Sequence, residues 1–111
     1  MDSILTSIKK MLGITADYTH FDDDLIMHIN SVFMTLNQLG VGPSEGFYIE
    51  DCTTYWDDYI DDPSRLQMIK SYMFMKVKLM FDPPASSTVT KCIEDQIKEF
   101  EWRLNVAVDP E

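Results

Sequence analysis

Two histidines and a run of aspartates are the residues of this chain that most resemble a metal site. His20 and His28 are the only histidines, and Asp22, Asp23 and Asp24 lie between them. Imidazole and carboxylate groups both bind zinc. However, ligands on one helix face must be three or four residues apart, and these imidazoles are eight residues apart. We therefore interpret the aspartates as the charged start of a helix and expect no metal.

A second acidic group has the composition of a calcium site. Its members are Asp57, Asp58, Asp61 and Asp62. A calcium-binding loop alternates its acidic ligands, turns at a central glycine and ends on a glutamate, and this segment has none of these features. We interpret these aspartates as solvated helix caps.

Catalytic signatures are missing from the sequence. No serine, cysteine or threonine stands in a nucleophile-elbow pattern, and no glycine-rich loop opens a helix. The two cysteines are Cys52, in a polar segment, and Cys92, within a helical pattern, and their spacing fits neither a zinc knuckle nor a redox pair. We expect no enzyme, no catalytic residue, no cofactor and no disulfide.

The charge balance restricts the partners of the chain. It has 19 acidic and 9 basic residues, for a net charge of -10. A negative surface disfavours binding to a nucleic-acid backbone or to an anionic membrane. No apolar run approaches the roughly 20 residues that span a bilayer. The polar start, Met1-Asp2-Ser3, lacks the order of a signal peptide, so we expect synthesis in a cytoplasm.

Apolar residues recur at helical spacing along most of the chain. A length of 111 residues fits a single domain, residues 1–111. The stripes predict an all-α fold, a small bundle of four to five helices with neighbours antiparallel. The predicted helices cover residues 3–13, 22–40, 55–60, 63–81 and 86–105. A long loop, residues 41–53, separates the second from the third, and residues 106–111 form a short acidic tail.

Helix starts and stops are marked by their usual residues. Ser3 is a candidate cap, Asp22, Asp23 and Asp24 supply a cap and negative charge, and Thr53 or Thr54 can cap the short third helix. Asp62-Pro63 opens the fourth helix, Asp82-Pro83-Pro84 ends it, and Ser86 or Ser87 caps the last.

Aromatic residues in polar surroundings are candidates for a protein interface. Trp56 lies between Tyr55 and a pair of aspartates, and Trp102 precedes Arg103. Aromatic and arginine side chains are typical anchors of interfaces. The alternative is that both tryptophans close the ends of the bundle core. The sequence does not decide between these. The eight methionines could form an adaptable docking surface, but we interpret them mainly as core, because methionine readily fills irregular gaps.

Several segments, in order, resemble the phage head-tail connector family. They are Met27 to Phe33 (MHINSVF), Leu36 to Pro43 (LNQLGVGP), Thr54 to Tyr59 (TYWDDY), Lys76 to Pro84 (KVKLMFDPP) and Gln96 to Asn105 (QIKEFEWRLN). These are packing motifs rather than catalytic signatures. The Phe-Asp-Pro-Pro break and Glu-Trp-Arg-Leu-Asn are the most distinctive.

This resemblance implies a virion structural protein at the neck of a tailed phage. Family members are helical subunits that assemble as a ring of about twelve copies beneath the portal protein, which is compatible with cyclic symmetry. The ring extends the DNA exit channel and offers a platform for neck, stopper or tail-completion proteins. Genomic DNA would pass through an acidic bore without specific binding.

A ring of acidic subunits must offset its own charge repulsion. We expect basic residues to meet acidic residues of the neighbouring subunit, together with the aromatic anchors. The predicted subunit-interface residues are Arg65, Lys70, Lys76, Lys78, Trp56, Trp102 and Arg103. The 41–53 loop and the 106–111 tail are expected to become ordered on docking.

A different function class is also compatible with this charge. A small acidic protein can imitate DNA and occupy a nucleic-acid-binding protein of the host. Such a decoy needs a continuous acidic track, whereas the acids of this chain gather at predicted helix starts, where capping already explains them.

Overall fold

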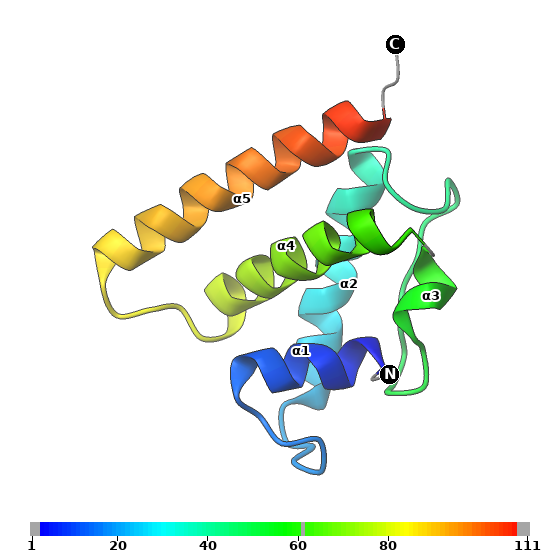
Figure 1. Cartoon of the computed structure of the whole chain (residues 1–111). Helices are drawn as coiled ribbons and strands as arrows, with labels where there is room; N and C mark the ends of the chain where they lie inside the picture. Colours follow the sequence, from blue (N-terminus) through cyan, green and yellow to red (C-terminus); the bar gives the residue numbers. More distant parts are fainter. Residues whose placement is uncertain (1–2, 61, 109–111) are drawn as a thin grey trace.

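Five α-helices make up the described part of the chain, residues 3–60 and 62–108 of a computed structural model (Figure 1). The helices are α1 (Ile4–Leu12), α2 (Asp22–Gln38), α3 (Trp56–Tyr59), α4 (Pro63–Phe81) and α5 (Ser87–Val108). An isolated antiparallel bridge joins Ser3 to Tyr55, and no strand occurs within the two described ranges. The predicted all-α class is confirmed.

Three helices begin at the residues that the sequence predicted. The Ser3 side chain accepts a hydrogen bond from the Thr6 amide at the start of α1. Asp62 caps α4 by accepting from the Ser64 amide at 3.1 Å, and Pro63 occupies the first position. The Ser86 hydroxyl accepts from the Val89 amide at 3.3 Å before α5. Each cap satisfies a backbone donor that has no partner within its own helix.

Two predicted caps were wrong. Helix α2 follows Phe21, which makes no side-chain cap, and the three aspartates lie inside its first turn, where their charge still favours the positive helix end. Helix α3 begins at Trp56, and neither Thr53 nor Thr54 caps it. The Asp58 carboxylate instead accepts from the Tyr55 amide at 2.9 Å.

The end of the last helix also differs from the prediction. Helix α5 continues to Val108, past residue 106, where we expected the acidic tail to begin. Residues 109–111 of that tail lie outside the described residues.

Helix α4 is the central element of the bundle. It packs against α1, α2 and α5, and α5 runs antiparallel along it after the break at Asp82 (Figure 1). Fully buried side chains from α1, α2 and α4 meet in one cluster with Trp56 of α3. Up to residue 106, α5 adds Ile97 and Leu104 to the buried set, and most of its other side chains in this part are exposed.

The segment between α2 and α3 has neither helix nor strand, as the sequence predicted for residues 41–53. Gly42 adopts a φ of 85°, and a Cβ there would lie 2.5 Å from the Tyr59 ring. Glycine is therefore required both by the backbone and by the close approach of α3.

Among the described residues, no helix is long and apolar enough to cross a membrane.

Candidate interaction surfaces

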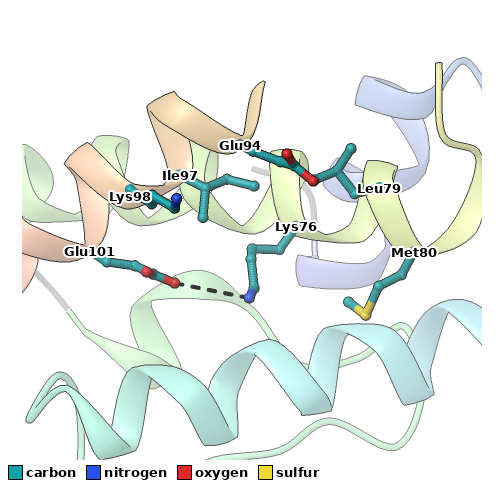
Figure 2. Close-up of a pocket in the computed structure, with 7 residues that line it drawn as sticks. All are labelled: Lys76, Leu79, Met80, Glu94, Ile97, Lys98 and Glu101. Atoms are coloured by element: carbon teal, nitrogen blue, oxygen red, sulfur yellow. Dashed lines mark ion pairs between the residues drawn. The ribbon is translucent and has the colours of Figure 1, made fainter. Parts of the chain in front are cut away.

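A groove of about 530 Å³ lies between α4 and α5 (Figure 2). Both helices line it, and its residues are Lys76, Leu79, Met80, Glu94, Ile97, Lys98 and Glu101. Ile97 and Leu104 of α5 are buried in the core and Ile93 and Phe100 pack against it, and the groove opens beside this stripe. We call this feature the α4–α5 groove.

Glu101 connects the two walls of the groove. Its Oε2 accepts a hydrogen bond of 2.7 Å from the Tyr72 hydroxyl and lies 3.9 Å from the Lys76 Nζ, the pair marked in Figure 2. Burial and this hydrogen bond raise the pKa of Tyr72 well above its usual value, because both favour the neutral phenol. Tyr72 therefore acts as a neutral donor that fixes α5 on α4.

The groove suits binding rather than bond chemistry. Leu79, Met80 and Ile97 supply apolar surface, and Met80 is 41% exposed. Lys76 of α4 and Glu94, Lys98 and Glu101 of α5 lie among these apolar side chains (Figure 2). Mixed apolar and charged side chains are usual in protein-binding surfaces.

A second exposed apolar surface lies on α2 and the following loop. Met27 and Met34 stand two helical turns apart and are 65% and 66% exposed, and Tyr48 of the loop is 66% exposed. A hollow beside Met34 is lined by Glu45, Phe47 and Tyr48, among others. We call Met27, Met34, Glu45 and Tyr48 the α2–loop surface.

Two asparagines hold the loop against α2. The Asn30 amide donates to the Ile49 carbonyl at 2.9 Å and accepts from the Ile49 amide at 2.7 Å. Two helical turns further along α2, Asn37 donates to the Pro43 carbonyl at 3.0 Å. These bonds attach the loop to α2 at two points. That the rest of the loop becomes ordered on docking stays a prediction.

The family model of phage connector proteins matches residues 4–111, nearly the whole chain. The chain belongs to the phage connector protein family. Comparison with curated proteins and with solved structures gave no match. The resemblance drawn from the sequence is confirmed, and membership assigns the chain a structural role at the phage neck.

The connector presents most of its basic residues on α4 and α5, where they already have partners. Lys78 pairs with Asp82 at 3.1 Å, and Arg103 pairs with Glu99 one turn earlier on the same helix. The Lys70 Nζ lies 5.6 Å from the centre of the Trp56 ring. Arg65 is half-buried near the start of α4. The predicted interface cations are therefore distributed along two helices rather than gathered at one point.

The two tryptophans of the connector have opposite environments. Trp56 is fully buried, and its Nε1 donates to the Ser7 hydroxyl at 2.8 Å, a placement that supports the alternative in which it closes the core. Trp102 is 68% exposed on α5, one turn beyond Lys98. Trp102 is therefore the more suitable anchor for a partner.

The acidic and histidine groups do not gather into a metal site. Within residues 3–60 and 62–108, no three histidine, cysteine or acidic side chains are placed to hold an ion. His20 instead stacks edge-on against Phe21, with ring centres 4.9 Å apart.

The sequence favoured the core over a docking surface for the methionines, but Met27 and Met34 of α2 are exposed. They lie outside the stripe formed by Leu25, Ile29, Val32 and Leu36, and that offset was visible in the sequence.

The composition of α4 gave a better signal. Tyr72, Met75 and Leu79 widen its apolar face, a width that is typical of a central helix or a subunit contact, and the helix is central.

Proposed function

We propose that this connector is a head-tail adaptor subunit that assembles as a ring beneath the portal protein. The ring extends the DNA exit channel and offers a platform for neck, stopper or tail-completion proteins. Membership of the phage connector family over residues 4–111 is the observation that carries this proposal. A multiplicity of about twelve is compatible with closed cyclic symmetry.

The charge of the chain suits a conduit for DNA. A net charge of -10 disfavours adhesion of a polyanion, so genomic DNA can pass without specific binding. We also propose that the subunit acts without catalysis, cofactor or membrane, as a structural protein of the virion neck made in the host cytoplasm.

The ring contact is proposed to use the exposed Trp102 and the basic residues of α4 and α5. Trp102 supplies apolar area, and Arg65, Lys70, Lys76, Lys78 and Arg103 lie on the same two helices. Since the pairs of Lys78 and Arg103 are solvent-exposed, a neighbour's carboxylates can share these cations at little cost. Trp56 would contribute indirectly, by supporting Lys70 from the core.

Electron microscopy of the connector mixed with the portal ring of its phage tests the proposal. We expect a second ring of density, coaxial with the portal and attached to one of its ends. Absence of such density, together with binding to a basic host DNA-binding protein, would favour the decoy function instead. The positions of the acids argue against a decoy, because Asp22, Asp23 and Asp24 lie in one helix turn and Asp62 caps another.

A further inference from the structure

Two exposed apolar surfaces lie on different elements of the described chain. Helix α4 packs with α2 and also with α5 (Figure 1). Met27, Met34 and Tyr48 are exposed on the α2–loop surface, and Met80 is exposed in the α4–α5 groove, with the exposed Trp102 on α5 one turn beyond Lys98. Methionine adapts its shape to a partner, which suits surfaces that must fit a second molecule.

The charges of the two sides are unequal. Residues 3–60 hold nine acidic and two basic residues, whereas residues 62–108 hold six acidic and seven basic residues. The chain has no lysine or arginine between Lys10 and Arg65, so α2, the loop and α3 contribute only acidic formal charge. The α4–α5 groove contributes Lys76 and Lys98 together with Glu94 and Glu101, so it is formally neutral, and Lys76 lies 3.9 Å from Glu101 while Lys98 lies on its rim.

This asymmetry distinguishes two ways in which copies can meet. A two-fold contact that sets the α2–loop surface against itself would oppose acids with acids. A head-to-tail contact would set Glu45 and its acidic surroundings against the lysines of the groove. Like charge is unfavourable and opposite charge favourable, so the head-to-tail arrangement is preferred.

We propose that the α4–α5 groove of one connector subunit receives the α2–loop surface of the next subunit. Met34 and Tyr48 enter the groove beside Met80 and Ile97, and Glu45 lies near Lys98. Because the bound copy still presents its own groove, the contact repeats from copy to copy, and it gives a ring rather than an open filament when the rotation between copies closes. This inference rests on the proposed function, since it names the contact that builds the adaptor ring.

A variant at each surface tests the contact. Met34→Asp alters the α2–loop surface, and Met80→Asp alters the groove, at positions that are 66% and 41% exposed. We expect each variant alone to lose ring formation, with self-association weakened at least tenfold, because a charge is placed in the centre of an apolar contact. Met11→Asp is the matched control: Met11 is 43% exposed on α1 and lies outside both surfaces, so this variant should assemble normally.

Mixing the two variants gives the decisive measurement, made by light scattering. Met80→Asp keeps an intact α2–loop surface and Met34→Asp keeps an intact groove, so an equal mixture should form one-to-one dimers and no ring. Ring formation by either variant, dimers of either variant alone, or a monomeric mixture would overturn the proposal.

Exposed charges provide a second pair of variants that spare the apolar contacts. Glu45→Lys and Lys98→Glu should each weaken assembly, and the two changes in one chain should restore it, while Lys91→Glu on the same helix should have no effect. Unchanged rings in both single variants would overturn this contact and leave the adaptor function standing. Groove variants that keep the ring but lose portal binding would assign the groove to the portal instead. No oligomer of the unaltered chain, alone or with the portal, would overturn both.

Discussion

The Nζ of Lys9 lies 2.8 Å from a carboxylate oxygen of Asp22, although the lysine is 99% buried and the aspartate begins the next helix. The same ammonium group donates to the Ala16 carbonyl at 3.0 Å and to the Tyr18 carbonyl at 2.7 Å. The Lys9 ammonium group therefore binds the α1–α2 connection at three points and holds it against the end of α1. A buried ammonium group is stable only when it is paired in this way.

Replacing this lysine with an apolar residue of similar length should destabilise the fold. Lys9→Met leaves two carbonyl groups and a partly buried carboxylate without their donor, at a cost of about 1–3 kcal/mol. Urea denaturation measures the change. Lys10→Met, at the exposed neighbouring position, should stay within about 0.5 kcal/mol of the unaltered protein. Equal stability of the two variants would contradict the assigned role of Lys9.

Asn30→Ala should release the loop from α2. The change removes both hydrogen bonds to Ile49, whose side chain is 2% exposed, and should cost about 1–3 kcal/mol. Hydrogen exchange of the Ile49 amide should become faster, whereas Ser31→Ala at the exposed neighbour should leave it unchanged. Slow exchange of that amide in Asn30→Ala would show that other contacts hold the loop.

The two tryptophans should separate stability from assembly. Trp56→Ala removes a fully buried indole and should lower the free energy of unfolding by about 3–5 kcal/mol. Trp102→Ala alters an exposed side chain and should change it by no more than about 0.5 kcal/mol, yet it should weaken ring formation. Thermal unfolding and light scattering on both variants give the comparison. A large loss of stability in Trp102→Ala would place that side chain in the core.

Alkaline pH should destabilise the protein through its buried tyrosines. Burial raises the pKa of Tyr59, and burial with the Glu101 hydrogen bond raises that of Tyr72. Above about pH 10 the unfolded chain releases these protons while the folded chain keeps them. The free energy of unfolding should therefore fall as pH rises, by up to about 1.4 kcal/mol per pH unit for each tyrosine.

Denaturation between pH 8 and 11 gives the slope. Tyr72→Phe should make it shallower, and Tyr48→Phe, at an exposed position, should not. An identical slope in all three proteins would show that Tyr72 ionises normally in the fold.

Local patterns predicted much of the fold because several helices carry their own start and stop. Asp62-Pro63 opens α4, because proline suits the first position of a helix. Asp82-Pro83-Pro84 ends it, because proline cannot continue a helix in any tertiary context. The burial of Lys9 could not be predicted in this way, since it depends on carbonyl groups seven and nine residues away that only the folded connection brings close. Helix α3 began later than expected because the Asp58 carboxylate supplied its cap.

The candidate surfaces were predictable only in part. The basic residues of α4 and the aromatic Trp102 were identified from residue type, and the sequence left the two tryptophans equal. Their separation is tertiary: Trp56 is enclosed by α1 and the core, whereas α5 presents Trp102 on the side away from its packing stripe. The α4–α5 groove could not be foreseen, because it depends on how narrowly two helices touch.

The mass of the purified protein over a concentration series, alone and with the portal ring of its phage, tests the adaptor function most directly. Light scattering should show a closed oligomer of fixed mass, or stoichiometric addition of subunits to the portal. A monomer at every concentration that leaves the mass of the portal unchanged would contradict the account.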